Sequence, residues 1–229
     1  MEYILFILAY LIGSIPFSIA VGKIAKGIDV RDYGSGNPGT TNAFRVLGKK
    51  LGFLVFFLDV LKGGFMIIVL RILYHYSILE PGYIPLLAFG LAAAIGHIYP
   101  IFIGFKGGKA VATSVGIFLA YAPLLGILGL LAYVVTLIAL RYVSVASCTG
   151  ALTLWVSTLV VYFFGPVNGS ALAYMIGQRG DLIMPVIATL GTSLILFRHR
   201  KNFLNIKKGI EPKSNFMAKN KVDNRIERP

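Results

Sequence analysis

The sequence predicts an all-α, polytopic membrane protein with seven transmembrane helices, the N-terminus outside and the C-terminus in the cytoplasm. Of its 229 residues, 57% are hydrophobic, and the mean hydropathy is +0.79. Soluble domains rarely contain so many apolar residues, and here they lie in long uncharged runs. The 22 lysines and arginines gather between those runs, as they do in cytoplasmic loops. We therefore expect the net charge of +13 to reflect membrane topology rather than nucleic-acid binding.

The first span is expected over Tyr3–Val21. The acidic Glu2 precedes this run and no basic segment does, so we expect a retained transmembrane helix rather than a cleaved signal peptide. The sequence Gly13-Ser14-Ile15-Pro16 lies near the middle of the run. Small residues at such a position favour close packing of a neighbouring helix, and we expect that to be their role.

Leu51–Leu73 is the second predicted span, and it contains the charged residues Asp59 and Lys62. Residues three apart share a helix face, so these side chains can form an ion pair, which must face the bundle interior or a polar cavity. A structural pair and a pair that lines a site both fit the spacing, and we favour the structural pair. The third span is expected over Tyr83–Ile103, where His97 is expected to be a structural histidine rather than a base.

Val111–Leu140 is an uncharged stretch of thirty residues, interrupted by Tyr121-Ala122-Pro123. One long helix and two helices joined by a tight turn both fit this pattern. Two crossings place nineteen of the 22 basic residues on one side of the membrane, whereas a single crossing moves Arg141 and the basic C-terminal segment to the opposite face. We therefore predict two helices, followed by spans over Val143–Phe164 and Asp181–Phe197, which brings the total to seven.

Two glycine-rich, cationic segments interrupt the apolar runs, Gly34–Arg45 (GSGNPGTTNAFR) and Phe105–Thr113 (FKGGKAVAT). Glycines allow backbone N–H groups to turn toward an anion, and a nearby lysine or arginine neutralises its charge. The helix Val111–Ala122, about 18 Å long, would direct its positive N-terminus at the second segment. With seven spans, both segments meet Arg141–Ser147 (RYVSVAS) and Arg198–Asn202 (RHRKN) on the cytoplasmic face. Such a set of cationic, hydroxyl and amide groups, with almost no carboxylate, suits a phosphate-bearing substrate.

Several common catalytic motifs are absent from the sequence. Lys109 is followed by Ala110, and Ile103 occupies the position of the first P-loop glycine, so this segment is not a nucleotide-binding loop. Neither G-x-S-x-G nor H-E-x-x-H occurs, and no carboxylate cluster is suited to Mg²⁺. None of the three histidines has an aspartate at the spacing of the His-x₄-Asp acyltransferase dyad. We therefore expect neither a metal nor another cofactor.

The chain contains, in this order, SGNPGTTNAFRVLG, GHIYPIFIGFKGGKAVAT and RHRKNFLNIKKGIE. In order and spacing these segments resemble the three signatures of the bacterial acyl-phosphate:glycerol-3-phosphate acyltransferase family. Gly13-Ser14-Ile15-Pro16 and Asp59-x-x-Lys62-Gly63 are also similar to that family, and the resemblance covers about Tyr3–Glu211. The family commonly has glycine where this chain has Ala110. We refer below to the three segments as the first, second and third motifs.

This resemblance implies an enzyme of the bacterial cytoplasmic membrane whose active site faces the cytoplasm. It would transfer a fatty acyl group from acyl phosphate to the 1-hydroxyl of glycerol 3-phosphate, giving lysophosphatidic acid and phosphate. An acyl phosphate is already activated, so positioning and charge stabilisation suffice without an enzyme nucleophile. The resemblance also implies that the substrate's own phosphate helps to take the hydroxyl proton. Membrane lipid is an expected partner and nucleic acid is not.

The motifs and the polar segments together assign roles to thirteen residues. Substrate binding is expected from Ser35, Gly36, Asn37, Asn42, Arg45, Gly107, Gly108 and Lys109. Catalytic roles are expected from Lys106, Ser144, Ser147, His199 and Asn202. At least one of the two lysines should contact phosphate. For Asn37 and Asn42, a loop-holding role is about as well supported as a contact with substrate.

Two other functions fit parts of the sequence. An anion transporter would use the second motif as a cytoplasmic vestibule, but it needs polar residues distributed across the bilayer, and here only Asp59 and Lys62 are embedded. A structural scaffold has no need of two cationic glycine loops. The sequence favours the enzyme, with residues 1–211 as a single transmembrane domain and residues 212–229 as a basic tail, expected to be disordered because it lacks apolar periodicity.

Overall fold

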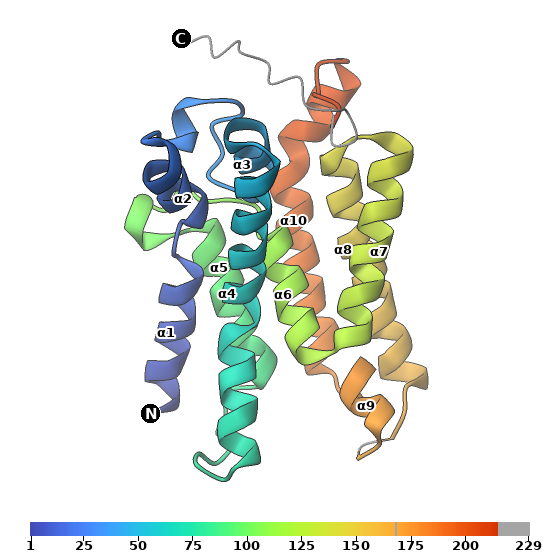
Figure 1. The fold of residues 1–229 in the computed structure, drawn as a ribbon. Coiled ribbons are helices and arrows are strands. Elements are labelled where there is room, and N and C mark those ends of the chain that lie inside the picture. The colour runs from blue at the N-terminus through green and yellow to red at the C-terminus, as the bar shows by residue number, and fades with distance from the viewer. Residues whose placement is uncertain (168, 215–229) are drawn as a thin grey trace.

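The computed structural model describes residues 1–167 and 169–214, and the regular secondary structure of this part of the chain is entirely helical, without a strand. The helices are α1 (Glu2–Gly13), α2 (Phe17–Lys26), η1 (Val30–Asp32), α3 (Thr40–Leu47), α4 (Lys49–His75), α5 (Leu86–Ile98), η2 (Ile101–Ile103), α6 (Val111–Tyr121), α7 (Pro123–Leu140), α8 (Val143–Phe164), α9 (Ala171–Ile176) and α10 (Ile183–Lys207) (Figure 1). The predicted all-α class is confirmed. The tail prediction falls largely on residues 215–229, which lie outside the described residues.

Four segments are long and apolar enough to cross a membrane, namely α4, Leu86–Ile103, α7 and α8. A fifth is counted if α1 and α2, which are bent by 45° relative to each other, form one span. α6 is apolar but has only 11 residues, so at 1.5 Å per residue it is about 17 Å long and shorter than the bilayer core. α10 covers the last predicted span and continues to Lys207 through the basic residues of the third motif. Length and composition therefore support four or five spans in the described chain.

The predicted first span is broken rather than continuous. α1 ends at Gly13 and α2 begins at Phe17, because Pro16 lacks an N–H and its ring clashes with the preceding turn of a helix. Gly13 also has the expected packing role, since a Cβ at this position would overlap the backbone of Ala93 on α5. The glycine permits close contact between α1 and α5, and the proline turns the chain toward the end of the bundle that carries α2 and α3 (Figure 1).

The uncharged stretch Val111–Leu140 forms two helices, as predicted. α6 ends at Tyr121, and Pro123 occupies the first turn of α7, where proline costs no helical hydrogen bond. α6 packs against α4 through glycines, and a Cβ added to Gly64 would lie 2.6 Å from the carbonyl oxygen of Gly116. This contact keeps the short helix α6 inside the bundle, with its N-terminus below the end that carries α3 (Figure 1).

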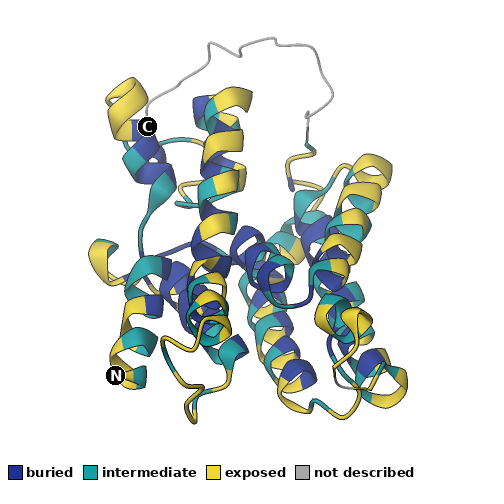
Figure 2. Cartoon of the chain, turned by 60° about the horizontal axis from the view of Figure 1, so that its bottom comes forward, coloured by how far each residue is buried: buried dark blue, intermediate teal, exposed yellow. Residues whose placement is uncertain are grey.

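Buried residues lie along the middle of the bundle, and exposed residues face outward (Figure 2). Large apolar side chains are exposed on the outer helices, among them Phe57 of α4, Leu131 of α7 and Phe163 of α8. An apolar surface of this extent is unusual for a soluble monomer and is the expected surface of helices that contact lipid. The structure therefore has the surface of an integral membrane protein.

Candidate functional site

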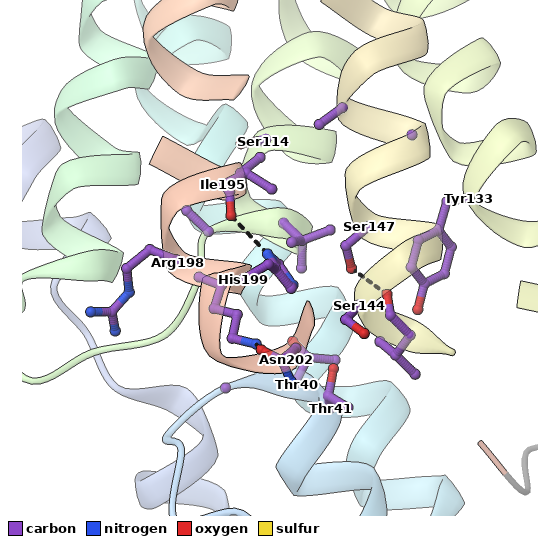
Figure 3. A pocket seen from close by; sticks show the side chains of 18 of the residues that line it. Thr40, Thr41, Ser114, Tyr133, Ser144, Ser147, Ile195, Arg198, His199 and Asn202 are labelled. Atoms are coloured by element: carbon purple, nitrogen blue, oxygen red, sulfur yellow. Dashed lines mark hydrogen bonds between the residues drawn. The ribbon is translucent and has the colours of Figure 1, made fainter. Parts of the chain in front are cut away.

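A pocket of about 530 Å³ opens between α3, α6, α7, α8 and α10 (Figure 3). Its polar part is lined by residues of all three motifs and by the start of α8. Its other part is lined by small and apolar residues of α7 and α8, which are Gly126, Gly129, Leu130, Gly150, Ala151 and Leu154. The pocket therefore joins a cationic, hydroxyl-bearing end to an apolar groove between two membrane-spanning helices.

Asn42 of α3 organises the loop that carries the first motif. Its Oδ1 accepts hydrogen bonds from the backbone N–H of Ser35 at 2.8 Å and from Ser35 Oγ at 3.2 Å. Its Nδ2 donates to the carbonyl oxygens of Val30 at 2.7 Å and Tyr33 at 3.1 Å. Because Asn42 is buried and bonded on both sides, it holds the loop in place, and Ser35 and Arg45 lie on the wall of the pocket.

Lys109 is the lysine of the second motif that reaches the pocket. Its Nζ donates to Asn202 Oδ1, and Asn202 Nδ2 donates to Glu211 Oε1 at 2.7 Å. Burial lowers the pKa of Lys109 to about 8, because the charged ammonium loses hydration, and the nearby Glu211 carboxylate partly opposes this shift. Lys106, by contrast, is exposed and does not line the pocket.

The rest of the second motif is clamped between α5 and α10. The backbone N–H groups of Gly107 and Gly108 donate to the carbonyl oxygens of Ile98 and His97, each at 3.0 Å. Arg198 of α10 donates to the carbonyl oxygens of both glycines, at 2.9 and 3.2 Å. These N–H groups are therefore occupied, and neither glycine lines the pocket. In this conformation the expected glycine cradle for an anion is not open.

The N-terminus of α6 faces the pocket instead. The preceding residue, Ala110, adopts the left-handed conformation with a φ of +57°, and its methyl side chain cannot accept a capping hydrogen bond from the helix. Val111, Ala112 and Ser114 of the first turn line the pocket. The uncapped N–H groups of a helix N-terminus attract anions, so this turn can supply the anion-binding backbone that Gly107 and Gly108 do not.

His199 of α10 and two serines of α8, Ser144 and Ser147, bring further hydrogen-bonding groups to the pocket (Figure 3). His199 Nδ1 lies 2.8 Å from the carbonyl oxygen of Ile195. A carbonyl oxygen only accepts, so Nδ1 carries the proton and Nε2 of the neutral ring is an acceptor. Ser147 Oγ donates to the carbonyl oxygen of Val143 at 2.8 Å, and Ser144 Oγ donates to Glu211 Oε1 at 3.1 Å. Both serine oxygens keep the capacity to accept a further hydrogen bond.

Glu211, the last residue of the third motif, is a site residue whose role was not predicted from the sequence. It is buried after the end of α10 and accepts hydrogen bonds from Ser144, Asn202 and Asn205. In the sequence, Glu211 is a single acidic residue in a strongly basic segment. That pattern indicates a site residue, but it also fits an acidic residue on a solvated surface.

The structure brings together nine of the thirteen predicted site residues. The pocket is lined by Ser35, Asn37, Asn42, Arg45, Lys109, Ser144, Ser147, His199 and Asn202. Gly36, Lys106, Gly107 and Gly108 lie outside its lining. The lining residues that were not predicted from the sequence include Thr40, Thr41, Ser114, Tyr133 and Glu211. Ser114 and Tyr133 lie inside predicted spans. There, the sequence does not distinguish a polar residue that lines a site from one that bonds to the backbone of its own helix.

The comparisons with known proteins agree with one another. The family model described as glycerol-3-phosphate acyltransferase matches residues 3–209. The chain is 43% identical over 219 residues to a glycerol-3-phosphate acyltransferase of Bacillus cytotoxicus, covering 96% of this chain and 98% of that protein. It is 40% identical over 214 residues to the enzyme of the same name from Acholeplasma laidlawii, covering 90% of each chain.

Two solved structures are also similar. Both are crystal structures of PlsY (YgiH), described as an integral membrane glycerol 3-phosphate acyltransferase. The glycerol 3-phosphate form has a TM-score of 0.76 and 37% identity, covering 94% of this chain and 96% of that chain. The lysophosphatidic acid form has a TM-score of 0.74 and 37% identity, covering 92% of this chain and 94% of that chain.

Proposed function

This chain belongs to the glycerol-3-phosphate acyltransferase family, and we propose that the pocket between α3, α6, α7, α8 and α10 is its active site. The enzyme transfers a fatty acyl group from acyl phosphate to the 1-hydroxyl of glycerol 3-phosphate, giving lysophosphatidic acid and phosphate. The observation that carries the assignment of the site is the convergence of Arg45, Lys109 and His199. These residues come from three different motifs and meet beside a groove suited to an acyl chain.

The chemistry needs positioning and charge more than an enzyme nucleophile. The 1-hydroxyl oxygen attacks the acyl carbonyl carbon, a new ester bond forms, and the bond from the acyl carbon to the phosphate oxygen breaks. The electron pair of that bond leaves with inorganic phosphate, and a phosphate oxygen takes the hydroxyl proton. Fixed cationic groups stabilise the charge that develops, and holding both substrates together removes much of the entropic cost.

The lining residues divide between the two substrates. Arg45 and Ser35 bind the phosphate of glycerol 3-phosphate, while Lys109 and the first turn of α6 bind the phosphate of the donor. His199 Nε2 and Ser147 orient the glycerol hydroxyls. The acyl chain lies along the groove of Gly126, Gly129, Leu130, Gly150, Ala151 and Leu154. This division matches the side chains to ligand chemistry, since phosphate prefers arginine, lysine and helix N-termini, and an alkyl chain prefers dry apolar walls.

We also propose that residues 1–211 form one transmembrane domain with seven crossings, made by the bent pair α1–α2 and by α4, α5, α6, α7, α8 and α10. The active site then faces the cytoplasm, with the N-terminus outside. Two observations support this arrangement. Nineteen of the 22 basic residues then lie on the cytoplasmic side. The N-terminus and the basic end of α10 also lie at opposite ends of the bundle (Figure 1).

Purified protein in detergent, given palmitoyl phosphate and glycerol 3-phosphate, is expected to release phosphate only when glycerol 3-phosphate is present and to form lysophosphatidic acid. Nothing in the family or the pocket supports the alternative of an anion transporter. Folded protein that gives no turnover, but carries glycerol 3-phosphate across proteoliposome membranes, would refute the enzyme.

Labelling with a membrane-impermeant maleimide tests the topology. Cys148 is the only cysteine, so single cysteines can be placed in a Cys148→Ala variant. In intact cells, Glu80→Cys is expected to be labelled and Lys50→Cys to be protected, because the loop after α4 is outside and the loop before it is cytoplasmic. The reverse pattern would invert the proposed topology.

A further inference from the structure

Asp59 is the centre of a buried polar cluster directly behind the wall of the pocket. Its Oδ1 lies 2.8 Å from Lys62 Nζ, and both side chains are at most 3% exposed. Lys62 Nζ also donates to the carbonyl oxygen of Ile15, in the break between α1 and α2, at 2.9 Å. The ion pair predicted from the sequence is therefore formed. Neither member lines the pocket, whereas Thr40 and His97, which also belong to the cluster, do.

The cluster contacts the first motif through Thr40. Thr40 Oγ1 donates to Asp59 Oδ2 at 2.8 Å. Thr40 is the first residue of α3, and the residue before it, Gly39, has no side chain with which to cap or anchor the helix. The bond to Asp59 therefore ties the N-terminal end of α3 to α4. Arg45 lies on the same short helix, so its position depends on that tie.

The cluster contacts the second motif through His97. Its Nδ1 lies 3.7 Å from Asp59 Oδ1, and a Cβ on Gly108 would overlap the other ring nitrogen. The carbonyl oxygen of His97 accepts the N–H of Gly108 at 3.0 Å. The imidazole thus fills the space between the carboxylate and the loop, and the loop places Lys109 in the pocket.

The geometry points to Asp59 as a positioning residue for the acyl transfer. Its carboxylate holds the helix that carries Arg45 and supports the loop that carries Lys109, so that the two cations face the two substrates at a fixed separation. A buried ion pair is costly to desolvate and often adds nothing to stability. Its placement between the two substrate-binding motifs therefore indicates a role in organising the site. This inference rests on the proposed function and adds a residue that does not itself touch substrate.

Kinetics of purified Thr40 variants test the first link. Thr40→Val keeps the shape of the side chain but loses the hydroxyl donor. We expect it to raise the KM for glycerol 3-phosphate about tenfold with little change in unfolding temperature, because loosening a positioning group misplaces Arg45. Thr40→Ser restores the donor and is expected to return the KM to within about twofold of the wild type. The matched control is Thr158→Val on α8, a buried threonine outside the pocket lining whose hydroxyl donates to the carbonyl of Trp155 in its own helix.

The double variant Asp59→Leu/Lys62→Met tests the carboxylate itself without leaving an unpaired charge. We expect it to raise the KM of both substrates, because both motifs lose their support. Adding Thr40→Val to this double variant is expected to change the KM for glycerol 3-phosphate by less than about twofold, since coupled residues are not additive. Because Asp59 and Lys62 are replaced together, neither charge is left unpaired. Thermal unfolding of the variant measures its folded fraction.

Three results would overturn the inference. The first is a folded Thr40→Val variant with both KM values unchanged. The second is an effect of Thr40→Val that multiplies with that of the double variant, which would show that Thr40 acts on substrate directly. The third is a double variant in which only the unfolding temperature is lowered, which would make the pair purely structural. Failure of the proposed function is distinct, because the wild type would then show no turnover.

Discussion

Lys109→Ala is expected to lower kcat/KM for acyl phosphate by about 10²–10³-fold, the range seen when a single charge-stabilising group is removed from an enclosed site. Lys109 is the lysine of the second motif that lines the pocket, and its ammonium is partly removed from water. A charge in such a place interacts with a phosphate more strongly than a solvated one. The measurement is steady-state phosphate release from the detergent-purified variant.

Two comparison variants sharpen this result. Lys50→Ala removes an exposed basic residue at the start of α4, outside the pocket lining, and tests the contribution of general surface charge. Lys106→Ala removes the exposed lysine of the same motif and is expected to cost less than Lys109→Ala. An equal loss from the two lysine variants of the motif would contradict the assignment to Lys109.

The pH dependence follows from the lowered pKa of Lys109. With a pKa of about 8, the ammonium loses its proton as the pH rises through this value, and the cation that binds phosphate is lost. We therefore expect kcat/KM, which reports the free enzyme, to fall above pH 8. The arginine of Lys109→Arg keeps its charge at every accessible pH, so kcat/KM of this variant should not fall above pH 8, even if its rate is lower. If the same fall persists in Lys109→Arg, it is caused by the titration of another group.

Arg45→Ala is expected to raise the KM for glycerol 3-phosphate by about 10²-fold or more, consistent with the loss of a charge-assisted, bidentate contact to phosphate. Arg45 lines the pocket, and in residues 1–167 and 169–214 no carboxylate forms an ion pair with it. Its guanidinium is therefore available to a ligand. Arg45→Lys should recover part of the loss, because lysine restores the charge but not the planar fork.

The critical comparison for Arg45→Ala is between its effects on the KM values of the two substrates. The KM for acyl phosphate should change much less in Arg45→Ala than the KM for glycerol 3-phosphate, because the proposed division assigns the two phosphates to different cations. Parallel titrations of each substrate at saturating concentrations of the other measure both constants. An equal rise in both would show that Arg45 does not distinguish the two phosphates, and the division between Arg45 and Lys109 would then be wrong.

Much of the helical framework was predictable, because the positions and ends of the helices depend on local features of the sequence, namely long apolar runs and the residues that interrupt them. The split at Ala122–Pro123 follows from proline at a helix start, and the pairing of Asp59 with Lys62 follows from their spacing. The break at Pro16 was visible in the sequence, but the first span was predicted as continuous. The cause is again local, yet whether proline kinks or interrupts a membrane helix depends on the groups that satisfy the freed backbone.

The site was predictable in chemistry but not in detail. The sequence does not distinguish Lys106 from Lys109, because both lie in the same glycine-rich loop. In the structure, the hydrogen bonds from Gly107 and Gly108 to α5 fix the loop so that Lys109 faces the pocket. The same bonds occupy the backbone donors that the glycines were expected to offer. Glu211 acquires its role from Ser144, 67 residues away, and from Asn202 on α10.

The sequence by itself determined that this protein is helical and membrane-embedded and that it carries two cationic, glycine-rich segments. These properties depend on apolar run lengths and on residues that are close together in each segment. The acylation of glycerol 3-phosphate followed from the resemblance of three motifs to a known family. Only the tertiary structure decided which members of the motifs share a pocket, that α6 presents its N-terminus there, and that Asp59 stands behind both cationic segments. The physical reason is that these relations are contacts between helices. Such contacts depend on how glycines and buried polar groups pack across the bundle, and no local pattern encodes them.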